Sequence, residues 1–252
     1  MSKFVMVFDT ETTSLDKPFC YDVGYFIIDT ETFEAAKDAH YVVEQNWHNL
    51  PLFESAYYKD KRPQYVSLMR TRNATMKKWG YVMQDMIRDI EKYGITDAYA
   101  YNSDFDEKVF NFNCEWFKTI NPFDNVAIHD IWGYASQFIT FRQEYKDFCE
   151  KYELFTDTGN YKGSAESVYQ FLTNNPEFVE AHMGVYDSEI EASILVMCVH
   201  EFGAKWSTDY KVNKIIERPK QIPFVIKINN QVIYDGKYTK KTIRNNVFSF
   251  KI

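Results

Sequence analysis

The chain has 252 residues and a mass of 30.0 kDa, which fits one large domain or one domain with a small appendage. Hydrophobic residues make up 45% of it and charged residues 26%, which supports a packed core and excludes a wholly disordered chain. The net charge of −7, taken alone, argues against a non-specific nucleic-acid binder. No apolar run approaches the roughly 20 residues of a spanning helix, and no signal-peptide pattern opens the sequence, so we expect a soluble, cytoplasmic protein with no membrane partner.

Charge is distributed unevenly along the chain. The segment 211–252 carries ten basic and two acidic residues, which leaves residues 1–210 with a net charge of −15. A second basic patch, residues 59–78, holds seven basic residues against one acid, with Tyr57, Tyr58, Tyr65 and Trp79 beside or within it. Either patch alone could be only a solvated face, but two of them around an acidic body call for another explanation.

Apolar patterning predicts a strand-rich start followed by alternating helices and strands. Strands are expected at 3–8, 21–28 and 39–43, as a meander, and then at 98–101 and 125–128. Helical spacing covers 75–93, 105–117 and 186–200, and more weakly 131–138 and 164–172. This order predicts an α/β fold in which helices cover a mixed sheet.

The tail differs in kind from the rest of the chain. Residues 222–229, 231–234 and 247–252 have strand character, with turn signals at Asn229-Asn230 and Asp235-Gly236. We therefore expect a main domain over 1–205 and a small, basic, β-rich C-terminal extension over 206–252. Four widely separated cysteines, with no Cys-x-x-Cys pair, indicate buried thiols rather than a zinc ribbon or a disulfide scaffold.

Two carboxylates follow the first predicted strand. Asp9 and Glu11 are two residues apart, and residues i and i+2 of a strand face the same side. Such a pair is unfavourable unless a cation or a proton separates it, and oxygen-only ligands suit Mg²⁺ or Mn²⁺. The same tetrapeptide recurs at 29–32, where a hairpin turn is expected, so we assign this second copy to a solvated turn.

Two more acidic motifs lie at predicted helix starts. In the segment 102–106, Asp104 could be only an N-cap and Asp106 only a favourable partner of the helix dipole. Further along, His182 stands five residues before Asp187, at the opening of the helix 186–200. Each motif taken alone is ordinary, and a structural role explains it.

Taken together and in this order, D-x-E-T, N-x-x-F-D and H-x-x-x-x-D resemble the three motifs of the DEDDh 3′→5′ exonucleases. This superfamily has a ribonuclease H-like fold and includes the proofreading subunit of bacterial DNA polymerase III, ribonuclease T and oligoribonuclease. The resemblance covers about residues 3–200 but neither the basic patch nor the tail. Ser14 stands where the family often has Gly, and Gly184 stands where it often has Ala.

The resemblance implies a role for five side chains. The metal ligands would be Asp9, Glu11, Asp106 and Asp187, and His182 would be the general base, since residue 183 is not the Tyr of the alternative branch. The same motifs imply substrate contacts, with an apolar wedge at residue 15 against a terminal base. These substrate-binding candidates are Thr12, Leu15, Asn102 and Phe105.

The implied reaction is stepwise hydrolysis from a free 3′ end of single-stranded DNA or RNA, releasing nucleoside 5′-monophosphates. Two ions, Mg²⁺ or Mn²⁺, would activate the water and stabilise the attacking and leaving oxygens. His182, with an ordinary pKa of about 6.5, would accept the proton of the water. The basic patch and the tail are candidate tracks for the upstream strand, in a contact that tolerates any sequence.

Three other interpretations stay open. The first is an oligoribonuclease-like enzyme for very short oligonucleotides, against which the basic segments argue mildly. The second is a non-catalytic nucleic-acid-binding or polymerase-associated module, although such a module need not keep all four acids and His182. The third is an acidic structural protein whose motifs match by chance. The sequence separates neither DNA from RNA nor one oligomeric state from another, and a polymerase is only a candidate partner.

Overall fold

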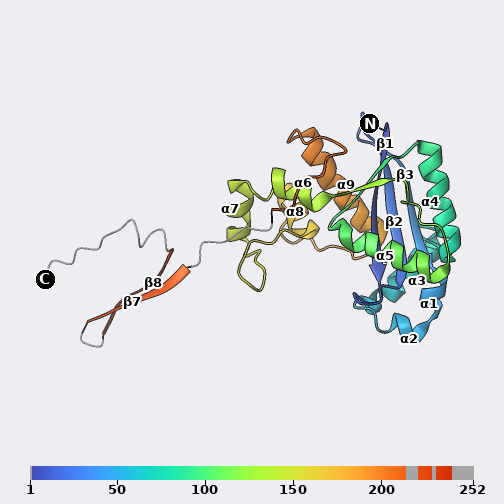
Figure 1. The fold of residues 1–252 in the computed structure, drawn as a ribbon. Helices are drawn as coiled ribbons and strands as arrows, with labels where there is room; N and C mark the ends of the chain where they lie inside the picture. Colours follow the sequence, from blue (N-terminus) through green and yellow to red (C-terminus); the bar gives the residue numbers. More distant parts are fainter. Residues whose placement is uncertain (1, 214–220, 229–230, 240–252) are drawn as a thin grey trace.

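The computed structural model describes residues 2–213, 221–228 and 231–239, with side chains up to residue 213. The strands of its main sheet are β1 (Phe4–Thr12), β2 (Cys20–Asp29), β3 (Ala35–Val43), β4 (Thr75–Lys77), β5 (Asp97–Ala100) and β6 (Ala127–Asp130). They form one mixed sheet in the order β4-β3-β2-β1-β5-β6 (Figure 1). The first three strands pair antiparallel, while β5, β6 and β4 each join their neighbour in parallel. The predicted meander and mixed sheet are thus confirmed.

Helices cover both faces of this sheet. They are α1 (Glu44–His48), α2 (Leu50–Phe53), the 3-10 turn η1 (Lys59–Lys61), α3 (Arg62–Thr71), α4 (Trp79–Tyr93), α5 (Ser103–Phe117), α6 (Ile131–Phe138), α7 (Gln143–Lys151), α8 (Ala165–Leu172) and α9 (Gly184–His200). Figure 1 shows α4 and α9 on opposite sides of the sheet. The helix predicted over 75–93 begins only at Trp79, because residues 75–77 pair with β3 as a short edge strand.

The central strand β1 divides its side chains between two apolar cores. Val5 and Val7 pack with residues of α6, α8 and α9. Met6 and Phe8 point the other way and pack with residues of α4 and α5. This alternation follows from the two-residue period of a strand, and it also decides where the polar residues after Phe8 point.

A third apolar cluster lies beneath α1, α2 and α3, and part of the basic patch is built into it. Tyr65 in this cluster and Trp79 in the cluster of α4 and α5 are fully buried, so these two rings offer no surface for stacking bases. Arg62 places its guanidinium 4.3 Å from the ring centroid of Trp47 and donates to that residue's carbonyl. Lys77 pairs with an acid of α4. A nucleic-acid contact along the basic patch therefore stays a prediction, and only the exposed residues of the patch could make it.

The tail contains a two-stranded antiparallel sheet, β7 (Gln221–Ile228) and β8 (Gln231–Thr239). The turn predicted at Asp235-Gly236 is wrong, since both residues pair within β8. The predicted turn at 229–230 and the predicted strand at 247–252 lie outside the described residues, and the domain boundary at 205 stays a prediction.

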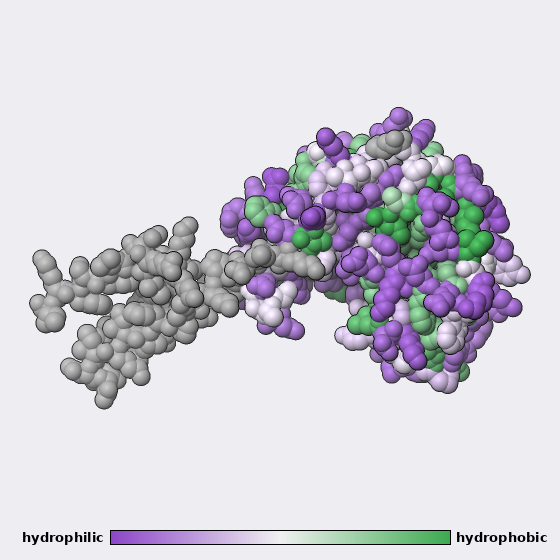
Figure 2. Space-filling view, in the orientation of Figure 1, coloured by the Kyte–Doolittle hydropathy of each residue, from purple (hydrophilic) through white to green (hydrophobic). Residues whose placement is uncertain are grey.

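Most large apolar side chains of the described residues are buried or partly buried. Hydrophilic residues cover most of the face shown in Figure 2, with apolar residues in separate patches. All four cysteines are free and buried, as predicted. Among the described residues, no helix combines the length and the apolarity that crossing a membrane requires.

Candidate active site

The first acidic motif lies inside β1 rather than after it, because pairing with β2 continues to the end of β1. The pleat that sends Val5 and Val7 toward α9 also sends Asp9 and Glu11 to that side. Thr10 points the other way, and its hydroxyl donates to Asp106 Oδ1 at 2.6 Å. Asp9 and Glu11 therefore project from one side of β1, and Thr10 binds a third carboxylate, that of Asp106, on the other side.

The second motif starts α5, next to the end of β6. Asp106 lies in the first turn of the helix and is only 2% exposed. Asn102 adopts a left-handed conformation, with φ of 62°, and its amide donates to Asp130 Oδ1 at 2.8 Å. Asp104 is exposed within the first turn, so it is not the N-cap of this helix. The sharp turn before α5 thus directs Asp106 inward and leaves Asn102 at the surface.

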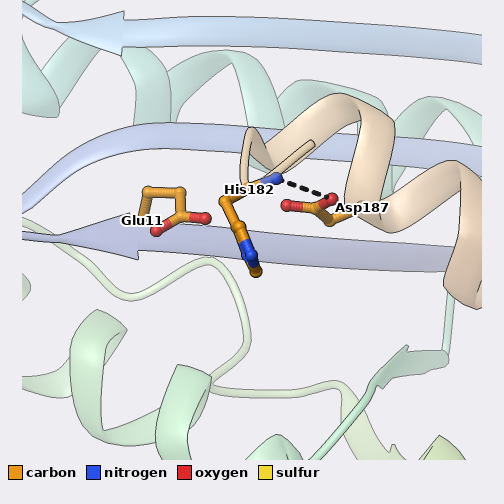
Figure 3. Close-up of side chains that lie close together, drawn as sticks. All are labelled: Glu11, His182 and Asp187. Carbon is orange, nitrogen blue, oxygen red and sulfur yellow. Dashed lines mark hydrogen bonds between the residues drawn. The ribbon is translucent and has the colours of Figure 1, made fainter. Parts of the chain in front are cut away.

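The third motif forms the start of α9, which begins at Gly184, two residues earlier than predicted. Asp187 accepts hydrogen bonds from the amides of Met183, at 2.6 Å, and His182, at 3.2 Å (Figure 3). The amide of Gly184 donates to Asp22 Oδ2 at 2.8 Å. Two carboxylates therefore accept from the amides of residues 182–184 at the helix start, and His182 lies between Glu11 and Asp187.

The start of α9 packs directly on the backbone of the sheet. A Cβ on Gly184 would lie 2.6 Å from the backbone nitrogen of Gly24, and one on Gly24 would lie 1.9 Å from that of Val185. The neighbouring atoms are backbone and have little room to move. Alanine, frequent at position 184 in the family that the motifs resemble, therefore does not fit here, which explains this departure.

The site opens into a cavity of about 700 Å³. Its walls contain Asp9, Glu11, His182, Asp187 and Asn102, whereas Asp106 lies behind Thr10 and does not line it. A second cavity of about 300 Å³ adjoins it and gathers the remaining substrate-binding candidates with two aromatic side chains. Its lining includes Thr12, Leu15, Phe105, Tyr57 and Tyr58. The structure therefore brings the predicted site residues together in one region of the molecule.

The carboxylates of the site resist ionisation. Burial and the neighbouring acids raise the pKa of Asp9 and Glu11 well above their ordinary values. Burial raises the pKa of Asp106 to about 7, although the bond from Thr10 opposes the shift. Burial and the charge of a nearby glutamate raise the pKa of Asp187 to about 8. The cluster therefore holds protons near neutral pH unless a cation replaces them.

One buried acid of the site, Glu191, was not predicted from the sequence. Glu191 lies one helical turn after Asp187, is 3% exposed, and accepts a hydrogen bond from the amide of Tyr101 at 3.0 Å. After burial, its charge is the main cause of the raised pKa of Asp9. The signal was present, because residues four apart share one face of a helix.

A second missed acid lies beside His182. Burial and the charge of Glu166 raise the pKa of Glu180 to about 7, and its Oε2 is 4.0 Å from His182 Nδ1. Burial and the ammonium group of Lys61 lower the pKa of His182. The imidazole is therefore neutral at physiological pH, the state in which it can accept a proton.

The donor set fits divalent cations. Asp9 Oδ2 is buried and has no hydrogen-bond partner within the part of the chain that the structure describes. Glu11, His182 and Asp187 each offer one ligand atom, and these three atoms lie within 4.8 Å of one another (Figure 3). A buried, unpartnered carboxylate oxygen amid other acids costs free energy that a bound cation would offset.

Comparisons with known proteins give the fold a precedent. No protein-family model matches the chain, and no curated protein does. The zinc-bound complex of E. coli exonuclease I with single-stranded DNA is 14% identical over 80% of this chain and 42% of that one, with a TM-score of 0.52. Exonuclease I with the inhibitor BCBP is 15% identical over the same shares, with a TM-score of 0.53. The nuclease domain of 3′hExo, a DEDDh family member bound to rAMP, is 13% identical over 81% of this chain and 96% of that one, with a TM-score of 0.48.

The chain has the fold of the matched part of exonuclease I. It spans about 42% of the length of that protein. The resemblance predicted from the three motifs is thus confirmed at the level of the fold, by a comparison that is independent of the motifs.

Proposed function

We propose that the chain is a divalent-cation-dependent 3′→5′ exonuclease that hydrolyses single-stranded nucleic acid to nucleoside 5′-monophosphates. The observation that carries this proposal is convergence. Three acids and a histidine from two distant segments line one cavity of about 700 Å³, and Asp106, from a third segment, lies behind Thr10. All five lie in a chain that has the fold of the matched part of exonuclease I.

The acids provide the cation site. Asp9, Glu11 and Asp187 face the cavity, and Asp106 supports the site from behind Thr10. Bound there, Mg²⁺ or Mn²⁺ would supply an activated water and stabilise charge on the phosphate oxygens. The raised pKa values support this role, because burial outweighs the hydrogen bonds that favour ionisation of Asp106 and Asp187, whereas a bound cation would favour the ionised form of these carboxylates.

His182 provides the proton acceptor. Its lowered pKa keeps the imidazole neutral, and its ring lies between Glu11 and Asp187 at the cavity. A neutral imidazole in this place can take the proton of an attacking water, which is the role of a general base.

The adjoining cavity of about 300 Å³ would bind the 3′-terminal nucleotide of the substrate. Leu15, Phe105, Tyr57 and Tyr58 give it apolar and aromatic walls, on which a terminal base can stack irrespective of sequence. Leu15 is 75% exposed, so it is available to a substrate. A single-stranded polymer is the favoured substrate, because the neighbouring exonuclease I structure was determined with single-stranded DNA.

Digestion of 5′-labelled single-stranded DNA and RNA with Mg²⁺ or Mn²⁺ tests the proposal. We expect a descending ladder and nucleoside 5′-monophosphates, both absent in Asp9→Asn and both retained in Asp85→Asn, which changes an acid on α4. Cleavage of dinucleotides alone would replace the proposal with the oligoribonuclease-like function. Binding without cleavage of any substrate would overturn it in favour of the binding module.

A further inference from the structure

The segment before α3 reaches the proposed general base. The ring of Tyr58 stacks on the imidazole of His182, with centroids 4.1 Å apart and an interplanar angle of 13°. Lys61, in the turn η1, donates from Nζ to the carbonyl of Ala181. Its ammonium group also lies 5.1 Å from the centroid of the Tyr58 ring. Lys61 of the basic patch and Tyr58 beside it thus contact Ala181 and His182, respectively.

These contacts help to hold the strained loop of residues 181–184 in place. His182 has a φ of 48°, in the left-handed region that a residue with a side chain rarely adopts. The amides of His182, Met183 and Gly184 are held by Asp187 and Asp22. Those bonds fix the backbone after Ala181, whereas Lys61 fixes the carbonyl before His182.

Helix α3, which follows this segment, also supports the loop. Tyr65, on α3, donates from its hydroxyl to Asp22 Oδ2 at 2.6 Å, the oxygen that also receives the amide of Gly184. Residues 58–65 therefore contact the loop through the side chain of His182, through the carbonyl of Ala181 and through Asp22. A segment that served only to bind distant parts of a nucleic acid would not need these contacts.

We propose that Tyr58 and Lys61 are positioning residues for His182. The Tyr58 ring sets the plane of the imidazole, and Lys61 holds the backbone from which that imidazole projects. Tyr58 also lines the cavity of about 300 Å³, so the terminal nucleoside and the general base share one wall. This inference rests on the proposed function for its catalytic consequence, while the contact itself can be tested without activity.

Proton NMR of the cation-free full chain tests the contact. Stacking on Tyr58 places the ring protons of His182 in the shielding region of an aromatic ring, so we expect them upfield of those of an exposed histidine. A His182→Gln variant identifies these signals among the five histidines of the chain. We expect Tyr58→Phe to keep the upfield position and Tyr58→Leu to lose it. An unchanged position in Tyr58→Leu would overturn the inference.

Steady-state kinetics on a short oligonucleotide tests the positioning. We expect Tyr58→Leu and Lys61→Gln to lower kcat by up to about 10²-fold, because a misplaced base slows the reaction after binding. Lys61 lines neither cavity of the site, so Lys61→Gln should change KM much less. Tyr58→Phe, which keeps the ring, should restore most of the kcat lost in Tyr58→Leu. Tyr81→Leu and Lys92→Gln, matched changes of side chains on α4, control for loss of an exposed ring or charge.

The outcomes separate this inference from the proposed function. If the wild-type chain cleaves nothing, the proposed function fails, and a catalytic role for Tyr58 fails with it even where NMR confirms the stack. If the wild-type chain cleaves but Tyr58→Leu keeps its kcat, the inference alone is overturned. A rise in KM with unchanged kcat in Tyr58→Leu would leave Tyr58 only as a wall of the substrate cavity, with no positioning role, and would also overturn the inference.

Discussion

Buried acids occupy two contrasting settings in this protein. Around the end of β1, Asp9 and Asp187 have pKa values raised by burial and by other acids. On α4 and β5, burial alone would raise the pKa of Asp85 and Asp97, but hydrogen bonds from a lysine, a threonine and a histidine lower it. Asp85 and Asp97 stabilise the fold through their partners. Asp9 and Asp187 lower the stability of the folded chain through their raised pKa values, as expected for acids of the proposed cation site.

Replacing one central acid should give the largest effect and the clearest contrast. We expect Asp9→Asn to lower cleavage at least about 10³-fold, since it removes an electrostatic contribution to the reaction. The same change removes a repelled carboxylate, so the variant should unfold at a higher temperature than the wild type in the absence of divalent cations. Cleavage rates and thermal unfolding check the two effects. A destabilised Asp9→Asn would mean that this carboxylate has a partner in the folded chain.

The two settings should also give stability opposite dependences on pH. An acid whose pKa is higher in the folded chain than in the unfolded chain binds more protons when folded, so stability falls as pH rises between these values. For Asp106 and Asp187 this window runs from about 4, the unfolded value, to the folded values of about 7 and about 8. For Asp85 and Asp97 the folded pKa is lowered, so their contribution is present above the unfolded value and is lost as pH falls below it.

Urea unfolding at several pH values, with and without Mg²⁺, measures this dependence. Without Mg²⁺ we expect the free energy of unfolding to decrease from pH 5 to pH 8. With Mg²⁺ the decrease should shrink or reverse, because the cation binds the ionised carboxylates of the folded chain. A flat profile without Mg²⁺ would contradict the raised pKa values of the central acids.

The close packing of α9 on the sheet allows the position of the helix to be changed without removing an acid of the site. Gly184→Ala changes no acid, yet its Cβ would lie 2.6 Å from the backbone of Gly24, so we expect a loss of about 1–3 kcal/mol in the free energy of unfolding. Gly80→Ala, on α4, meets only a side-chain methyl group at 3.5 Å and should be neutral or stabilising. Denaturant unfolding of the pair checks this, and equal effects would show that α9 has room to move.

The smallest effect should come from the edge of the sheet. Asp85 pairs with Lys77 and Arg88, whose side chains are partly exposed, so Asp85→Asn should cost at most about 1 kcal/mol of stability. Cleavage should stay at the wild-type rate, because Asp85 lies on α4 and lines neither cavity of the site. Thermal unfolding and the digestion assay measure both effects, and a loss of activity would place this edge in the working site.

The placement of the motif residues could be predicted from the sequence because it depends on local patterns. A strand period fixes the shared side of Asp9 and Glu11, and the position of Asp187 at a helix start follows from the apolar stripe behind it. The second copy of the tetrapeptide forms the predicted turn, although Asp29 is not solvated: it is largely buried and accepts two turn amides. Glu191 could have been found from its helical spacing.

The contacts of the basic patch could not have been predicted in the same way. Lys61 is 120 residues from Ala181 in the sequence, and no period or motif links the two positions. The helices α1 and α2 span only five and four residues, too few for a periodic signal. The rings of Tyr65 and Trp79 looked available beside basic residues, but tertiary packing buries them. Long-range packing, rather than local propensity, decides each of these features.

Calorimetric titration of Mn²⁺ near neutral pH tests most directly the central claim that the acids at the end of β1, whose pKa values are raised, bind a divalent cation. In buffers of different ionisation enthalpy, the wild-type chain should bind Mn²⁺ and release protons, because the carboxylates hold protons before binding. Asp9→Asn should lose most of this binding, and Asp85→Asn should keep it. Absence of Mn²⁺ binding by the wild type, or identical binding by Asp9→Asn, would contradict the account.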